Sequence, residues 1–414
     1  MAGQLKVNGV TLATEESGTV TLENPQIKDS SNNLVFDQSG SRPVLKNVDI
    51  KDSSNNLILD QSGTNPVLKN VEVVNNSSMM FRNKLINGDM RIDQRNAGAA
   101  VTGVGGTPGV YSLDRFRNGF PSTTARYSIQ QVNDAPAGFY NSLKVTITTP
   151  ESSLASNSVS VIGQIIEGFN CYDIKTTGAQ KPTAFSFWVK SSKTGTFVVE
   201  FGDFPNARAV SATYTISSAN TWEYKTIAFP ADTGATWTAS NSSAAILQFF
   251  LFAGSDFTSG TLQTTWASYT NANRAVGQSN LADTNGATFY ITGVQLEVGT
   301  VATQFEHRPY GAELSLCKRY YATGRVSGLV GYAGGRLSSF TDVNFEVEMR
   351  AIPTAYVSYN GTAGTIRDNN NGTALNGWTT IEGTNQYIAV RNSNNSVGAA
   401  NHHFSTTYFA DSEL

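Results

Sequence analysis

FSFWVKSSKTGTFVVEF, at residues 185–201, is the stretch that decides the fold class. Two runs of aromatic and β-branched residues flank a short Ser/Lys/Gly segment, which predicts a β-hairpin. Similar runs recur at 142–148, 222–229, 246–252 and 288–296. Strands at such regular intervals over residues 80–321 predict one antiparallel jelly-roll sandwich. Helical spacing is scarce, and residues 311–321 (GAELSLCKRYY) are the best candidate for a helix.

Composition supports an all-β protein. The chain has 414 residues, of which 15% are charged, 10% are aromatic and 37 are glycine. The formal net charge of −3 favours neither nucleic acid nor an anionic membrane as partner. Two cysteines, Cys171 and Cys317, are too few for a disulfide scaffold, and we expect two buried thiols in a protein assembled in a reducing cytosol.

Neither an export signal nor a membrane-spanning segment is expected. The opening residues, MAGQLKVNGVTLATEES, have no basic region followed by an apolar one. The most apolar run, AAILQFFLFA at 244–253, contains Gln248 and is far shorter than the ~20 residues that a spanning helix needs. We therefore expect it to form a buried strand.

Residues 26–48 and 49–71 form a tandem repeat of 23 residues. QIKDSSNNLVFDQSGSRPVLKNV and DIKDSSNNLILDQSGTNPVLKNV agree at 18 of 23 positions. Each copy holds too few apolar residues for a core of its own, so it must pair or stack with other copies. We expect a stalk in which three chains intertwine and share one apolar axis. The residues expected on that axis are Leu34, Phe36, Val44, Leu57, Leu59 and Val67.

These patterns divide the chain into four parts. Residues 1–25 form a leader, residues 26–79 the repeat stalk and residues 80–321 the jelly roll. Residues 322–414 alternate Gly-rich turns with expected strands at 344–349, 355–359 and 387–390. They predict a second, smaller β domain at the distal end of the chain.

Several strings resemble a known family. NKLINGDMRIDQR (83–95), YSLDRF (111–116), residues 185–201 and ATFYITGVQLEVGTVATQFEHRPYGAELSLCKRYY (287–321) are similar to the jelly-roll module of tailed-bacteriophage fibre and receptor-binding proteins. They are most similar to fibres of phages that infect marine bacteria and cyanobacteria. The resemblance implies a homotrimeric virion fibre, assembled in the host cytoplasm, whose leader attaches to another tail or virion protein. It also implies adhesion to a host surface glycan or lipopolysaccharide, but it carries over no site residues.

Catalytic and metal sites have little support in the sequence. Seven acidic residues of the jelly roll could in principle act on a glycosidic bond, but none lies in a catalytic string: Glu151, Glu167, Asp173, Asp203, Asp232, Asp256 and Asp283. Asp114 and Arg115 in YSLDRF are expected to form a structural pair or turn. His402 and His403 are adjacent and would point to opposite faces of a strand, so they suit a metal poorly. We expect neither an enzyme nor a bound cofactor or metal.

Aromatic residues are the best candidates for glycan binding, because sugar rings stack on aromatic faces. Trp188 lies within an expected strand and is expected in the core, whereas Trp222, Trp237 and Trp266 lie at strand edges or loops. A distal set is favoured because a fibre meets its receptor with its tip, so residues 322–414 are expected to form the receptor-binding tip. Loops on a rigid scaffold carry recognition residues, and Tyr359 and Trp378 lie next to Asn-Gly turns. That set is Tyr332, Tyr359, Trp378 and Tyr387.

Three functions follow from these observations. The first is a tail fibre that adheres to host glycans as a homotrimer. The second is a purely structural virion protein, such as a head fibre or a connector between the tail and another fibre. The third is a glycan-degrading spike, although such spikes usually carry repeats through their body and here the repeats stop near residue 74.

Overall fold

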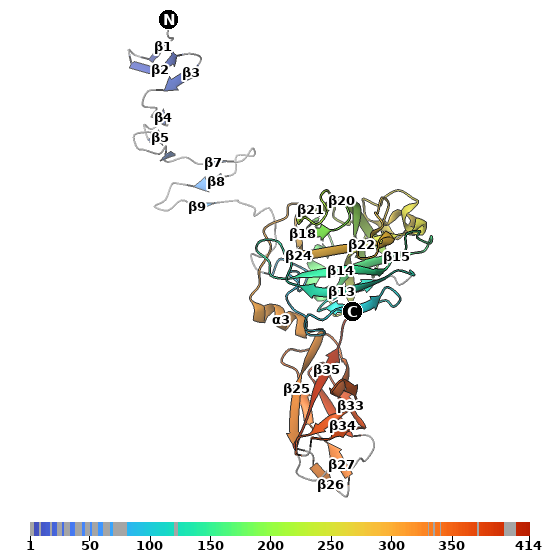
Figure 1. Ribbon diagram of the computed structural model, residues 1–414. Helices are drawn as coiled ribbons and strands as arrows, with labels where there is room; N and C mark the ends of the chain where they lie inside the picture. Colours follow the sequence, from blue (N-terminus) through green and yellow to red (C-terminus); the bar gives the residue numbers. More distant parts are fainter. Residues whose placement is uncertain are drawn as a thin grey trace. The chain divides into compact units, whose positions relative to one another are not determined.

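The computed structural model describes side chains for residues 81–119, 123–327, 342–370, 372–380, 383–390 and 403–414, and elsewhere only the backbone of the strands. The chain divides into two compact units, Met1–Val74 and Asn75–Leu414. Strands dominate both units (Figure 1). Within the described residues, no helix is long and apolar enough to cross a membrane.

In the first unit, the described strands form three small antiparallel sheets. Its leader forms β1 (Gln4–Val7), β2 (Val10–Glu16) and β3 (Thr19–Leu22). The first repeat forms β4 (Ile27–Lys28), β5 (Leu34–Asp37) and β6 (Val44–Leu45), and the second forms β7 (Ile50–Lys51), β8 (Leu57–Asp60) and β9 (Val67–Leu68). The two repeats thus fold alike. The six residues expected on a trimer axis all lie on these strands, but their side chains are outside the described residues.

The jelly roll is built from two antiparallel sheets. In spatial order, the six-stranded sheet holds β10 (Val101–Val104), β13 (Arg126–Val132), β14 (Ser142–Thr149), β24 (Thr288–Val298), β18 (Thr183–Ser191) and β21 (Glu223–Phe229). The seven-stranded sheet holds β11 (Tyr111–Leu113), β12 (Phe116–Gly119), β15 (Val159–Glu167), β22 (Ser243–Ala253), β19 (Gly195–Asp203), β20 (Arg208–Ile216) and β23 (Ala267–Ser268). The expected sandwich is therefore confirmed.

Short elements complete this domain. Strands β16 (Lys175–Thr176) and β17 (Ala179–Gln180) pair with each other. Helices α1 (Gly168–Cys171) and α2 (Ser255–Thr258) are single turns, as are the 3-10 turns at Tyr172–Ile174, Asn271–Asn273 and Leu281–Asp283. Helix α3 (Tyr310–Lys318) confirms the one helix that spacing predicted, with Cys317 on its buried face.

The predicted hairpin at 185–201 is wrong, although both of its strands exist. Strand β18 pairs with β21 and β24 in one sheet, whereas β19 pairs with β20 and β22 in the other. The turn between β18 and β19 therefore carries the chain across the sandwich. Phe187 on β18 and Phe197 on β19 are both fully buried between the sheets, so apolar alternation alone could not separate this crossing from a hairpin.

A smaller β domain follows from Tyr321. Its main sheet places β35 (His403–Asp411) in the centre, with β25 (Tyr321–Leu329) along one edge (Figure 1). Along the other edge lie β29 (Thr354–Tyr359) and β31 (Ile366–Asp368), followed by β30 (Thr362–Ala363) and β32 (Ala374–Leu375). The second sheet holds β28 (Thr341–Asn344), β34 (Tyr387–Asn392) and β33 (Trp378–Gly383), and β26 (Gly331–Ala333) pairs with β27 (Arg336–Ser339).

Two of the three strands predicted in this domain are confirmed, at 355–359 and 387–390. The third, at 344–349, is wrong because β28 ends at Asn344. The segment that follows is a loop, held by hydrogen bonds from Phe345 N to Gln386 O and from Met349 N to Asn385 O. Met349 is fully buried, so its apolar character serves the packing of a loop rather than a strand.

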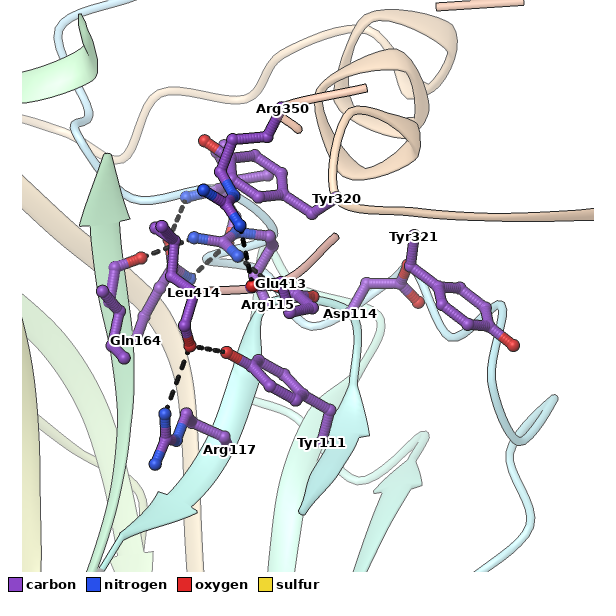
Figure 2. Close-up of polar contacts among 12 residues, drawn as sticks. Tyr111, Asp114, Arg115, Arg117, Gln164, Tyr320, Tyr321, Arg350, Glu413 and Leu414 are labelled. Carbon is purple, nitrogen blue, oxygen red and sulfur yellow. Dashed lines mark hydrogen bonds and ion pairs between the residues drawn. The ribbon is translucent and has the colours of Figure 1, made fainter. Parts of the chain in front are cut away.

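The last residues of the chain dock into the jelly roll (Figure 2). Glu413 is ion-paired with Arg115 and lies 3.3 Å from Arg95 Nη2. Leu414 O accepts hydrogen bonds from Tyr111 Oη at 2.8 Å and from Arg117 Nη1 at 3.2 Å. This segment thereby joins the two β domains by charge-assisted contacts.

Asp114 and Arg115 are both structural, as expected, but they do not pair with each other. Asp114 accepts hydrogen bonds from Gln94 N and Nε2, both at 2.6 Å. Arg115 has a φ of +71° and only 1% of it is exposed, and its guanidinium lies 3.5 Å from the centroid of the Tyr320 ring. Its counter-charge is Glu413, about 300 positions away along the chain, which no local pattern could identify.

Candidate functional site

The outward face of the seven-stranded sheet carries a row of polar residues. Strand register aligns Arg117 of β12 with Gly163 of β15, Gln248 of β22, Glu200 of β19 and Ser211 of β20. Directly opposed residues of an antiparallel ladder share a face, so this row crosses five strands. Residues two positions away on the same strand share this face. On β15, for example, apolar Val161 and Ile165 lie on either side of Gly163.

A buried charge network lies in this row. The Glu200 carboxylate is fully buried and accepts hydrogen bonds from Arg274 Nε at 2.7 Å and Arg274 Nη2 at 2.6 Å. It also accepts one from Gln248 Nε2 at 2.6 Å, which fixes the orientation of that amide. The buried Gln248 Oε1 consequently has no hydrogen-bond partner among the described residues. An unused buried acceptor of this kind costs about 1–3 kcal/mol.

A cavity of about 330 Å³ is lined in part by Gln248. Gly163 forms part of its lining, with the apolar side chains of Val161, Ile165 and Ile246 around it. A Cβ at Gly163 would lie 2.4 Å from Leu247 O, so the neighbouring strand permits only glycine there. Because Gly163 has no side chain, it leaves a gap in the polar row, and apolar side chains line the floor of that gap. We call this cavity the sandwich groove.

Two aromatic rings line the sandwich groove. Phe204, which follows β19, is 42% exposed, and Tyr269 comes from the segment after β22. Burial and the nearby Glu200 carboxylate raise the pKa of Tyr269, so its hydroxyl stays protonated at neutral pH. Arg274 lies with its Cζ 4.8 Å from the Tyr269 ring centroid. Apolar ring faces beside a few fixed polar groups are the chemistry that sugars require.

A second aromatic surface lies on the outward face of the six-stranded sheet. Trp188 and Tyr224 stand side by side on β18 and β21, with ring centroids 5.3 Å apart. They line a cavity of about 530 Å³ together with Phe139 and Phe305. The expectation that Trp188 belongs to the core is wrong, because its neighbours Phe187 and Val189 point inward and Trp188 outward. Tyr224 is 45% exposed, so this face is a second candidate for sugar binding.

The aromatic residues predicted for the distal domain do not form one group. Trp378 is 2% exposed and packs in the distal core, so it offers no ring face to a ligand, and this prediction needs correction. Tyr359, at the end of β29, is partly exposed and lies near Arg367. Tyr387 is partly exposed on β34, in the other distal sheet. The side chain of Tyr332 lies outside the described residues.

Two of the loop tryptophans enclose a buried lysine. Lys175 Nζ lies 4.7 Å from the Trp237 ring centroid and 3.9 Å from that of Trp266. The same ammonium is 2.7 Å from Asp203 Oδ2 and 2.7 Å from Asp232 Oδ2. The two carboxylates neutralise the Lys175 ammonium, and the two indole rings pack against it. Both tryptophans therefore have a structural role.

Four more of the acidic residues named above, Glu151, Glu167, Asp173 and Asp283, also have partners in the protein. Glu151 accepts hydrogen bonds from Thr123, Thr124, Ala125, Ala155 and Ser158. Glu167 pairs with Arg319, Asp173 with Lys84 and Asp283 with Lys193. His307 packs against Phe139 and Phe305, and Cys171 and Cys317 are buried free thiols. Among the described side chains, no group of three possible metal ligands occurs.

The sandwich groove was missed by sequence reasoning. Its polar row is assembled from strands far apart in the chain, and its covering residues come from a loop without any motif. One signal was present, since Gln248 interrupts the apolar run at 244–253. A buried polar side chain within a strand requires a partner or a ligand.

The sequence matches no protein-family model and no curated protein. Among solved structures, the chain is similar to the enzymatically active domain of bacteriophage CBA120 tailspike protein 4, at 14% identity and a TM-score of 0.28 over 52% of this chain and 21% of that one. It is also similar to a family 11 carbohydrate-binding module from Clostridium thermocellum in complex with a mixed-linked tetrasaccharide, at 12% identity and a TM-score of 0.23 over 51% and 100%. A third, TmCBM61 with β-1,4-galactotriose, has 9% identity and a TM-score of 0.22 over 52% and 99%. The chain spans about a fifth of the tailspike chain, and these similarities are too distant to assign a ligand or a partner.

Proposed function

We propose that this protein is a carbohydrate-binding adhesin that holds a glycan in the sandwich groove. The observation that carries the proposal is the sandwich groove itself, an apolar cavity with two aromatic rings beside an amide and a guanidinium that Glu200 holds in place. Phe204 offers an apolar ring face to a sugar, and Tyr269 adds a hydroxyl.

The biological setting extends this proposal. The resemblance of residues 83–321 to phage fibre modules and the tandem 23-residue repeats support a homotrimeric tail fibre in the virion, assembled in the host cytoplasm. Such a fibre would attach to other virion proteins through its leader and present its β domains to host glycans or lipopolysaccharide. Three copies would raise weak glycan affinity by avidity. We propose that it binds without cleaving, because six of the seven acidic residues considered above, all except Asp256, are engaged by other groups of the protein.

The test is glycan binding by the intact chain and three alanine variants. Phe204→Ala removes a ring of the groove, and Phe169→Ala removes a ring of the jelly roll that is 53% exposed and outside the groove. We expect the first to weaken binding of host-surface oligosaccharides several-fold and the second to leave it unchanged. Gln248→Met should also weaken binding, because it replaces the amide that lines the groove and donates to Glu200.

A third alanine variant separates the two aromatic surfaces. Tyr224→Ala alters the outward face of the six-stranded sheet and leaves the groove intact. Loss of binding in Tyr224→Ala with full binding in Phe204→Ala would move the site to that face. A chain that binds no host oligosaccharide would favour the structural alternative, a head fibre or a connector.

A further inference from the structure

The main distal sheet has one polar face, defined by strand register. On the central strand β35, Thr407 is paired with Arg325 of β25 and with Ser358 of β29. Two positions earlier, Ser405 is paired with Arg367 of β31. Opposed residues, and residues two apart on one strand, point to the same side of a sheet. These five polar residues therefore share one face.

The opposite face of the same sheet is the distal core. Val357, Ile366 and Phe404 alternate with the polar residues and are fully buried. The arrangement is the one that a half-buried antiparallel sheet requires, with apolar residues inward and polar ones outward. Packing on the core thus holds the polar face in a fixed geometry.

A cavity of about 270 Å³ lies on the polar face. Arg325 and Arg367 line it together with hydroxyl side chains, and Tyr359 adds an aromatic ring. Arg367 Cζ lies 5.9 Å from the centroid of that ring. The Asn360–Gly361 turn, with φ of +50° and +78°, follows Tyr359 at the end of β29, and such turns hold hairpins tightly. We call this cavity the distal pocket.

Among the described residues, the positive charge of the distal pocket has no acidic partner. Arg325 Nη2 donates to Ser405 Oγ at 3.3 Å, and Ser405 Oγ donates to Asn369 Oδ1 at 2.9 Å. Arg367 Nε is buried and has no hydrogen-bond partner within the described part of the chain. Neither arginine forms an ion pair there, whereas Arg115 and Arg274 of the jelly roll each face a buried glutamate.

We propose that the distal pocket binds the oxyanion of an acidic sugar. This inference rests on the proposed glycan-binding function for its ligand class, and it names a second site in a different domain. Guanidinium groups bind carboxylate, sulfate and phosphate through paired N–H donors, and hydroxyl side chains complement sugar hydroxyls. The Tyr359 ring offers the apolar contact that a sugar ring adds to its anion. A neutral sugar would leave both guanidinium groups without a counter-charge.

The experiment titrates the full chain with small ligands, followed by calorimetry and by ligand-observed NMR. Glucuronate, glucose 6-sulfate and glucose 6-phosphate distinguish the three oxyanions, while glucose tests the uncharged ring and inorganic sulfate the anion alone. We expect at least one acidic sugar to bind about tenfold or more tightly than glucose and inorganic sulfate. Arg367→Gln and Arg325→Gln should each lower that affinity about tenfold, and Arg126→Gln on the jelly roll should leave it unchanged.

Several results would overturn the inference. Acidic sugars binding no better than glucose, or inorganic sulfate binding as well as they do, would exclude an acidic sugar as the ligand. A change in oligomeric mass in Arg367→Gln with unaltered affinity would make the polar face an interface between copies. The two proposals fail separately, because Phe204→Ala reports on host-surface oligosaccharides in the sandwich groove and Arg367→Gln on small acidic sugars in the distal pocket.

Discussion

Replacement of Glu413 by glutamine should destabilise the protein strongly, although the residue lies near the end of the chain. Glu413 is 4% exposed by side chain and pairs with Arg115, of which 1% is exposed. Glu413→Gln keeps the shape but leaves a buried guanidinium without its counter-charge. Breaking a buried pair in this way typically costs about 3–5 kcal/mol.

Two remaining contacts place the expected cost near the lower end of that range. Arg115 would still donate to Ile165 O at its 2.5 Å contact and would still lie over the Tyr320 ring. A buried cation–π contact contributes about 2 kcal/mol at most. We therefore expect a loss of about 3 kcal/mol, a large part of the ~5–15 kcal/mol that stabilises a typical domain.

Urea unfolding followed by tryptophan fluorescence measures this loss. The matched control is Glu346→Gln, because Glu346 pairs with Lys318 but its side chain is 76% exposed, and exposed pairs contribute about 0–1 kcal/mol. Arg115→Met combined with Glu413→Gln should cost less than the sum of the single changes, because the unpaired charge is then gone. A cost for Glu413→Gln no greater than for Glu346→Gln, or full additivity, would refute the reasoning.

Three further predictions concern acid stability, assembly and chemistry. Burial alone would raise the pKa of Glu151, but its hydrogen bonds lower that pKa to about 2. Its contribution to folding stability is therefore present above pH 4.5 and is lost as pH falls toward 2. Glu151→Gln should make the melting temperature depend less on pH over this range. Replacing Leu57 and Leu59 by aspartate should abolish the stalk trimer in light scattering, and a well-folded wild-type monomer would contradict the trimer altogether. Incubation with host capsule or lipopolysaccharide should release no reducing ends or unsaturated sugars; release that disappears in an acid-to-amide variant would identify an enzyme.

Local patterns predicted the elements far better than their connections. The runs at 142–148, 222–229 and 288–296 became β14, β21 and β24 almost residue for residue, because alternation directly encodes a strand with one buried face. The pairing of β18 with β21 rather than with β19 depends on contacts across the sandwich. Nothing in the Ser/Lys/Gly turn distinguishes a hairpin from a crossing between sheets, since both need the same short polar connection.

The candidate sites were predictable only in part, for a similar reason. Tyr359 was singled out by its Asn-Gly turn and does line the distal pocket, but Arg325 and Arg367 reach it through pairing with β35. Trp378 has the same kind of turn beside it and is buried. A turn thus marks where an aromatic residue leaves a strand, while the side of the sheet to which it points depends on the tertiary register.

Arg117 belongs both to the sandwich groove and to the docked end of the chain. It lines the groove, and its Nη1 donates to Leu414 O beside the Tyr111 hydroxyl (Figure 2). The distal domain therefore holds one side chain of the groove in place, although it contributes no residue to the groove lining. Contacts that position a binding side chain reduce the entropy lost when a ligand orders it. Docking of the distal domain is thus expected to favour glycan binding in the jelly roll, which gives the two β domains a physical reason to act as one unit.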